Sequence, residues 1–215
     1  MKSLSKTPAS LTLLVLIAAV FVGQQTGFVQ PLYFAQINEA VLAGQWWRLL
    51  TGVFLHADIV HIAFNGYALY LLGPPLERSV GSPAFAALFL ASGLSGATAY
   101  LYLGAPGSFV VGASGAIFGM FGAWLASALV QHRSPAGAAQ LRTLGVLLAI
   151  NLALPLFVQG IAWQGHLGGL VAGFIIFLGW VQMRRRSAGT WMRALLAVLV
   201  GIASLLPALA LGGAP

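Results

Sequence analysis

Ser114 and His166 are the residues of this chain whose types suit a nucleophile and its base. Ser114 stands in Gly112-Ala113-Ser114-Gly115 at the predicted start of an apolar helix, and His166 lies among glycines much later in the chain. A serine hydroxyl is a weak nucleophile until a base such as histidine takes its proton. The free backbone N–H groups of a helix N-terminus can also stabilise the oxyanion that such an attack produces. Together the two residues indicate nucleophilic catalysis, although each alone is also typical of a helix N-cap or a structural histidine.

Three further polar side chains, His56, His61 and Asn65, occur at the start of another apolar stretch. His61 and Asn65 are four residues apart, so they share one helix face and can aim hydrogen-bond donors at one point. Polar groups in lipid are costly, so they mark either function or hydrogen bonds that hold helices together. All five polar residues fall toward the same ends of their predicted helices, which favours one shared site.

Small residues accompany both members of the predicted pair. They are Gly115, Gly119 and Gly122 after the serine, and Gly169 and Gly173 after the histidine. Glycines at this spacing allow two membrane helices to approach very closely. If these two faces meet, the His166 ring can reach the Ser114 hydroxyl.

The sequence pattern offers no carboxylate that would join Ser114 and His166 as the acid of a catalytic triad. The chain has only three carboxylates, and none stands in helical register with Ser114 or His166. Asp58 is typical of an N-cap for the helix that follows it. Glu77 falls on the other side of the membrane in the topology below. The hypothesis is therefore a Ser–His dyad and not a triad.

The composition is that of an integral membrane protein. Hydrophobic residues make up 60% of the chain and charged residues only 6%, whereas a soluble domain carries about 25% charged residues. Cysteine is absent, which excludes disulfides and thiolate metal sites. The net charge of +7 does not indicate nucleic-acid binding, because the basic residues lie in short loops between apolar runs.

Hydropathy predicts an all-α bundle of seven membrane-spanning helices. The predicted helices cover residues 10–29, 58–73, 82–103 and 114–131, two helices within 143–183, and residues 191–211. We expect Pro74-Pro75 to end the second helix, and a break near residues 159–160 to separate the fifth from the sixth. The segment 30–57 is too polar to span and too apolar for a free loop, so we expect it to lie at the membrane interface.

The basic residues orient this topology. Nine of the ten Lys and Arg residues fall on one side of the predicted membrane, and only Arg48 falls on the other. The positive-inside rule then makes the N-terminus cytoplasmic. The five polar residues would open to the extracytoplasmic side.

The motifs resemble those of the rhomboid family of intramembrane proteases, from about residue 45 to residue 173. The matching motifs are Trp47-Arg48, His56-x4-His61-x3-Asn65, Glu77-x3-Gly81, Gly112-x-Ser114-Gly115, and His166 with the glycines that follow it. Five motifs in the family's order make this a specific resemblance. It implies a rhomboid-like core of six helices, residues 10–183, after a short cytoplasmic N-terminus, residues 1–9. Residues 184–215 would add a basic loop and a seventh helix.

The resemblance also implies a role for each matched side chain. Ser114 would be the nucleophile and His166 the general base and acid. His61, Asn65 and the Ser114 backbone N–H would form the oxyanion hole. His56 would support the local structure or a water path.

Around these residues, the resemblance implies supporting positions. Trp47 and Arg48 would hold the shape of the first extracytoplasmic loop, and Gly112, Gly115 and Gly169 are supporting positions within the matched motifs. Phe118 stands where bacterial relatives often carry a tyrosine that stacks on the histidine. Phenylalanine keeps the stacking ring face and loses the hydroxyl.

The implied activity is a serine endopeptidase of a bacterial inner membrane that cleaves transmembrane segments of other proteins. It needs no cofactor or metal and binds no nucleic acid; its partners would be transmembrane substrates and the lipid bilayer, and its oligomeric state is open. A transporter, a zinc protein and a catalytically inactive rhomboid-like binding protein are the alternatives, of which the zinc protein lacks an H-E-x-x-H motif. A rhomboid specialised for C-terminal sorting signals is a further variant within the family.

Overall fold

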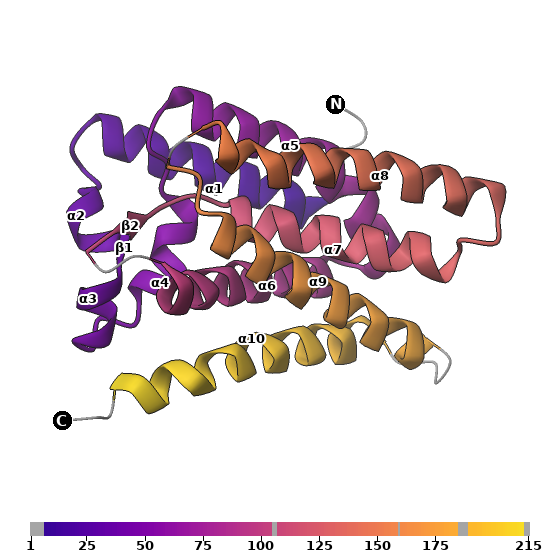
Figure 1. Cartoon of the computed structure of the whole chain (residues 1–215). Coiled ribbons are helices and arrows are strands. Elements are labelled where there is room, and N and C mark those ends of the chain that lie inside the picture. The colour runs from indigo at the N-terminus through magenta and orange to yellow at the C-terminus, as the bar shows by residue number, and fades with distance from the viewer. Residues whose placement is uncertain (1–6, 105–106, 159, 185–188, 213–215) are drawn as a thin grey trace.

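A computed structural model of the chain describes residues 7–104, 107–158, 160–184 and 189–212. Its elements are α1 (Pro8–Gln25), α2 (Pro31–Phe34), β1 (Gln36–Ile37), α3 (Asn38–Leu42), α4 (Arg48–Thr51), the 3₁₀ helix η2 (Gly52–Phe54), α5 (Ile59–Val80), α6 (Ser82–Leu103), β2 (Phe109–Val110), α7 (Ser114–Val130), α8 (Pro135–Ala153), the 3₁₀ helix η3 (Leu154–Leu156), α9 (Trp163–Arg184) and α10 (Thr190–Gly212). The long helices run roughly along one axis, and the short elements α2 to α4, β1 and β2 gather at one end (Figure 1). The predicted all-α membrane bundle is confirmed.

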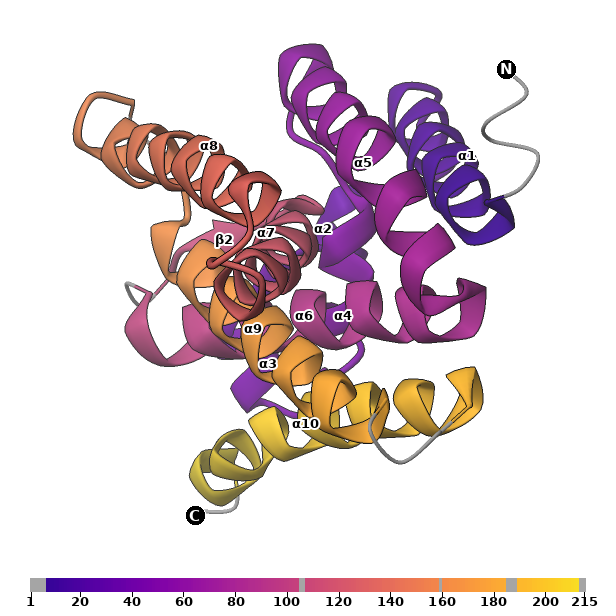
Figure 2. The ribbon, with the colours of Figure 1, turned by 90° about the vertical axis from the view of Figure 1, so that its right-hand side faces the viewer.

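Helix α6 lies at the centre of this bundle. It packs extensively against α9, α7 and α10, while the most extensive helix pair is α7 with α9. Viewed along the bundle, α1 and α5 lie on one side, α8 covers the outer side of α7, and α10 runs across the outside of α6 (Figure 2). The buried apolar side chains come mainly from these inner helices, as Phe85, Phe89 and Ile176 illustrate.

The second long helix differs from the prediction, because Pro74 and Pro75 lie inside α5 and do not end it. A proline in a helix removes one backbone donor, which leaves a carbonyl of the preceding turn without its usual partner. Membrane helices tolerate this when a neighbouring helix supplies a donor. The carbonyls that lose their helical donors here are those of Tyr70 and Leu71; beside them, the Trp124 indole of α7 donates to the Leu72 carbonyl at 3.3 Å and so holds this part of α5 against α7.

The extension of α5 places Glu77 inside the bundle, where its side chain is only 2% exposed. Its carboxylate accepts bonds from the Ala9 N–H at 2.9 Å and from the Ser10 N–H and hydroxyl at 2.8 and 2.6 Å. It also accepts from the Ser82 hydroxyl at 2.6 Å. Glu77 thus ties the first turns of α1 and α6 to the end of α5, and an acid at these helix N-termini is favoured by the helix dipole.

Helix α8 begins at Pro135, eight residues before the predicted start of its span. Ser134 is its N-cap, and the Ser134 hydroxyl accepts a bond from the Gly137 N–H at 3.0 Å. Arg142 is exposed in this first part of the helix. Its charge indicated a loop before the predicted span, but the residue belongs to α8. The predicted break at Gln159 and the basic residues 185 and 186 lie outside the described residues.

Four helices within the described residues are long and apolar enough to cross a membrane: residues 8–25, 82–103, 135–156 and 163–183. A fifth span results if residues 48–54 and α5, which meet at a 91° bend, are counted together. Helix α7 and residues 190–206 of α10 are also apolar, but these two stretches are shorter. The predicted count of seven spans is therefore not confirmed by length and composition.

Candidate active site

Ser114 is the first residue of α7, and its side chain is half-buried. The chain reaches it through Gly112, whose φ of 122° favours glycine, and the Gly112 N–H donates to the Gly52 carbonyl at 2.9 Å. A helix of this kind leaves its first N–H groups without partners inside the helix. Ser114 therefore stands beside backbone donors and at the positive end of a helix dipole.

Glycines bring α9 against the backbone of α7 and α6. A Cβ atom at Gly169 would collide with the Gly115 carbonyl oxygen, and a Cβ atom at Gly173 with the Gly119 carbonyl oxygen. At Gly96 of α6, a Cβ atom would lie 2.6 Å from the Gly165 carbonyl oxygen. Three helices thus meet with almost no side chains between them, one turn from Ser114 and His166.

The His166 ring faces α7 from this contact. It stacks on the Phe118 ring, with the ring centroids 4.1 Å apart and the planes at 9°. Phe118 is 3% exposed and lies four residues, about one turn, after Ser114. The His166 Nδ1 atom is buried and has no hydrogen-bond partner among the described residues. No hydrogen bond joins His166 to Ser114 within the described chain, and such bonds are often long in a substrate-free site.

His61 lies against the other side of the serine loop. A Cβ atom at Gly112 would lie 2.6 Å from both Cε1 and Nε2 of the His61 ring, so only glycine fits there. The backbone N–H of His61 donates to the Asp58 carboxylate at 2.8 Å, which makes Asp58 the N-cap of α5. The His61 and His166 imidazoles are close enough to interact electrostatically.

Asn65 and His56 complete the polar cluster around His61. Asn65 is 5% exposed, and its side-chain amide donates to the His61 carbonyl at 2.9 Å. His56 is 1% exposed and meets the His61 ring edge-on, with the centroids 5.0 Å apart. Neither His56 ring nitrogen has a hydrogen-bond partner among the described residues. The cluster therefore holds imidazole and amide donors with hydrogen-bonding capacity left for a ligand or water.

Gln24, at the end of α1, is a further residue of the site that no sequence motif indicated. Its side-chain amide donates to the His56 carbonyl, and its side-chain oxygen accepts from the His56 N–H, both at 3.0 Å. This pair of bonds fixes the backbone where His56 enters the cluster. The signal was an amide side chain at the end of an apolar run.

Arg48 is the buried cation of the segment between α1 and α5, at 6% exposed. One guanidinium nitrogen, Nη1, donates to the Leu32 and Ala35 carbonyls, each at 2.8 Å. The Nε–H donates to the Gln45 side-chain oxygen at 2.6 Å. Trp47 is 53% exposed, and its indole N–H lies 3.4 Å from the Tyr33 carbonyl. These bonds organise the segment that carries β1.

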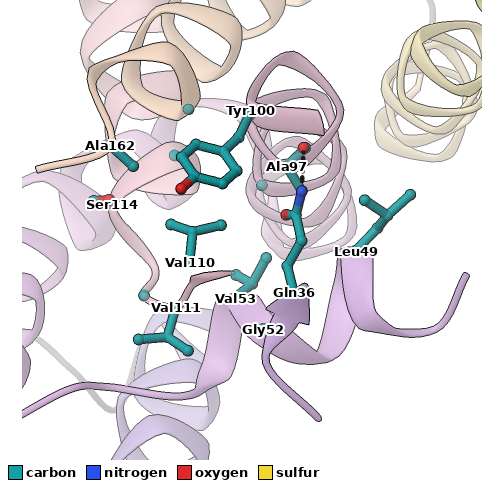
Figure 3. A pocket seen from close by; sticks show the side chains of 15 residues that line it. Gln36, Leu49, Gly52, Val53, Ala97, Tyr100, Val110, Val111, Ser114 and Ala162 are labelled. Carbon is teal, nitrogen blue, oxygen red and sulfur yellow. Dashed lines mark hydrogen bonds between the residues drawn. The ribbon is translucent and has the colours of Figure 1, made fainter. Parts of the chain in front are cut away.

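Strand β1 joins this segment to the loop before the serine. It pairs antiparallel with β2, with Gln36 opposite Val110 and Ile37 opposite Phe109. The Gln36 side chain also donates to the Ala97 carbonyl of α6 at 2.9 Å, as Figure 3 shows. The polypeptide just before Ser114 is therefore held by a strand pairing and not by loop packing alone.

A small pocket lies beside Ser114, between α6, η2, β2 and the start of α9 (Figure 3). Glycine, alanine and valine form much of its wall, including Gly52, Gly96, Ala97 and Val110. Its volume is about 30 Å³, whereas about 10–15 Å³ is enough for one water molecule. The pocket has room for water or a small side chain next to the serine.

Comparison with known proteins identifies the class. The Rhomboid domain pattern matches residues 43–185. The chain is 41% identical to "Rhomboid protease GluP" of Bacillus subtilis (strain 168) over 145 residues, which are 65% of this chain and 27% of GluP. It is 36% identical to "Putative rhomboid protease YdcA" of the same organism over 150 residues, 69% of this chain and 74% of YdcA. Similarity to "Rhomboid-like protease 1" of Toxoplasma gondii, 36% over 181 residues, covers 81% of this chain and 60% of that protein.

The chain therefore belongs to the rhomboid family, as the sequence motifs indicated. The matched stretch spans only 27% of GluP. The fold is that of a helical, multi-pass membrane protein.

Proposed function

We propose that this protein is an intramembrane serine endopeptidase that cleaves transmembrane segments of membrane proteins through a Ser114–His166 dyad. The observation that carries the proposal is the stacking of the His166 ring on Phe118, one turn from Ser114. The contact of Gly169 with the Gly115 carbonyl oxygen supports the same juxtaposition from the helix backbones. Membership of a family whose named relatives are rhomboid proteases supports the reaction class.

In the proposed reaction, His166 takes the Ser114 hydroxyl proton as Oγ attacks the scissile carbonyl carbon. The resulting tetrahedral oxyanion collapses, the peptide C–N bond breaks, and His166 donates the proton to the leaving amine. A water molecule then gives a proton to His166 and attacks the acyl carbon; the ester C–Oγ bond breaks, His166 returns the proton to Oγ, and the second product leaves with a new carboxyl terminus. Stacking on Phe118 holds the imidazole plane during both transfers.

The oxyanion would be stabilised at the N-terminus of α7. The backbone N–H of Ser114 supplies one donor, and the His61 ring, packed on Gly112, supplies a second. The Asn65 amide has two N–H bonds, and one of them donates to the His61 carbonyl. The other remains for the oxyanion.

A substrate helix would enter the site from the side, between α5 and α8. Only 11% of the span formed by α8 and η3 is buried in the bundle. On α5, the side chains of Phe64, Tyr67 and Tyr70 are 70%, 62% and 50% exposed, so this helix presents a large apolar face to lipid. The polar cluster lies at the Ser114 end of these helices. The orientation that we propose from the basic residues puts the N-terminus in the cytoplasm, and this end of the helices then faces the extracytoplasmic side.

The division of the chain follows the same proposal. Residues 10–183 would form the protease core, preceded by the cytoplasmic residues 1–9 and followed by residues 184–215 with α10. Helix α10 packs mainly on α6, and it reaches α5 only at its start, where the Thr190 hydroxyl donates to the Val80 carbonyl at the end of α5. It would therefore leave the substrate path open.

The test combines a fluorophosphonate probe with cleavage of a transmembrane reporter by purified protein. Wild type should label and cleave, whereas Ser114→Ala and His166→Ala should lower cleavage by several orders of magnitude and abolish labelling. Ser204→Ala is the matched control, because the Ser204 hydroxyl only donates to the Gly201 carbonyl within α10. Labelling that persists in Ser114→Ala would refute the nucleophile. A folded wild type that neither labels nor cleaves would indicate the catalytically inactive binding protein.

A further inference from the structure

A second cavity opens at the end of the bundle opposite Ser114. Its volume is about 400 Å³, against about 30 Å³ for the pocket beside the serine. It lies among the ends of α5, α7 and α9 and the start of α10, which are the helix ends that face the viewer in Figure 2. The residues that give it its character are Ser79, Trp124, Ser127, Phe177, Trp180 and Arg193. The proposed reaction uses none of them.

Aromatic rings form the apolar wall of this cavity. The Trp124 N–H donates to the Leu72 carbonyl at 3.3 Å, and the Trp180 N–H donates to the Arg193 carbonyl at 2.9 Å. Because the Trp124 N–H is engaged in the protein, its half-buried ring offers the cavity carbon surface, whereas Trp180 is only 2% exposed and closes the wall from behind. Phe177 adds a third ring. Such a wall suits a hydrocarbon chain.

The polar side of the cavity is cationic. Arg193 lines it from the first turn of α10, together with Ser127, whose hydroxyl accepts from the Gln131 side-chain amide, and Ser79, whose hydroxyl donates to the Leu76 carbonyl. A guanidinium group matches the geometry of two phosphate oxygens, and hydroxyl groups are common additional phosphate contacts. Cation and aromatic wall in one cavity fit a ligand with an anionic head and an apolar tail.

The positive charge at this end of the bundle also favours an anionic ligand. Arg78, Arg133 and Arg142 lie at the same ends of α5, α7 and α8 as the cavity. The chain has three carboxylates, and only Glu77 lies at this end, where it accepts bonds from the first turns of α1 and α6. The end as a whole is strongly positive. The cytoplasmic leaflet, toward which basic residues orient, is rich in anionic lipid.

We propose that this cavity binds an anionic phospholipid, with the phosphodiester against Arg193 and an acyl chain along Trp124 and Phe177. The lipid would bridge α10 to the ends of α5, α7 and α9. Free phosphate shares the head-group chemistry but leaves the aromatic wall uncovered, so it should bind far more weakly.

The experiment counts lipids bound to the purified full chain by native mass spectrometry during titration with dioleoyl phosphatidylglycerol. Arg193→Gln should raise the apparent dissociation constant at least about tenfold, the effect expected for loss of a charge-assisted contact. Arg133→Gln is the matched control: it removes the same charge from an exposed position outside the cavity, and it should leave the constant close to that of wild type. Ser79→Phe keeps the net charge and fills the cavity edge, so it should also weaken binding. A circular dichroism spectrum confirms that each variant is folded.

Competitors decide the source of the phosphate group. Dioleoyl phosphatidylcholine and millimolar inorganic phosphate should not displace phosphatidylglycerol. Displacement by phosphate alone would overturn the lipid proposal in favour of a free-anion site. Equal weakening by Arg193→Gln and Arg133→Gln, or unchanged binding in Ser79→Phe, would show general attraction to a positive surface and would also overturn it.

Discussion

Replacement of Gly169 by alanine tests whether backbone contact between α7 and α9 positions the site. The added Cβ atom would collide with the Gly115 carbonyl oxygen and lie 2.7 Å from its carbonyl carbon and 3.1 Å from the Gly115 Cα. Carbon atoms in contact are normally about 3.5–4.0 Å apart. The two helices must therefore move apart by roughly 1 Å, or the backbone must distort. Ser114 directly precedes Gly115 on α7, and His166 lies one turn before Gly169 on α9.

The expected loss of stability is moderate, because two effects oppose each other. Overpacking of a tight contact costs about 1–3 kcal/mol. Alanine gains about 1 kcal/mol over glycine in a helix. The net change in the free energy of unfolding is thus a loss of roughly 0–2 kcal/mol. Activity should fall much further, because a misplacement of about 1 Å costs about 100-fold in rate.

The assay compares the rate of reporter cleavage with the free energy of unfolding in the same detergent. Gly145→Ala is the control, because a Cβ atom at Gly145 of α8 meets nothing within 4 Å. This variant should be as active as wild type and slightly more stable, by up to about 1 kcal/mol. Wild-type cleavage by Gly169→Ala would refute the reasoning, as would a loss of activity no larger than its unfolded fraction explains.

Two other side chains give separate predictions. Phe118→Leu removes the ring on which His166 stacks; it should slow cleavage by about 2–10-fold, as expected for about 0.5–1.5 kcal/mol of aromatic stacking, whereas Phe118→Tyr should retain the rate. An unimpaired Leu variant would show that the stack does not orient the base. Glu77→Gln replaces one acceptor oxygen by a donor opposite backbone and hydroxyl donors, and it should lower the free energy of unfolding by about 2 kcal/mol. The exposed Glu39→Gln is its control, and equal values for the two variants would contradict the proposed tie.

The helices that were predicted best are those bounded by strong local signals. Helix α6 begins at Ser82 and ends at Leu103, as predicted, because Gly81 with a φ of 90° precedes it and Gly104 follows it. Helix α5 was mispredicted because the rule that proline ends a helix is local, whereas the part of α5 after the prolines is held by other helices, through the bonds from Ala9 and Ser10 to Glu77. Those bonds join residues 68 and 67 positions apart, and no local pattern reveals them.

The candidate site follows the same division. The placement of Ser114 at a helix start was readable from the glycine before it and the apolar run after it. The clamp between Gln24 and His56, and the pairing of β1 with β2, join segments that are far apart in the chain. Whether a polar residue serves the site or stabilises the fold depends on such long-range contacts. For this reason the sequence placed Glu77 in a motif but did not reveal that it ties α1 and α6 to α5.

The glycines at the junction of α6, α7 and α9 explain why fold and site depend on the same contacts. In lipid, apolar surface gains little from association with other apolar surface, so membrane helices associate through close packing of small residues. Gly96, Gly165 and Gly115 provide that packing where the three helices meet, directly beside Ser114 and His166. A larger residue at this junction removes both the packing that holds the helices and the distance that the dyad requires. The position of the proposed dyad is therefore set mainly by backbone contacts, and a change of side chain size should disturb it more than a change of side chain polarity nearby.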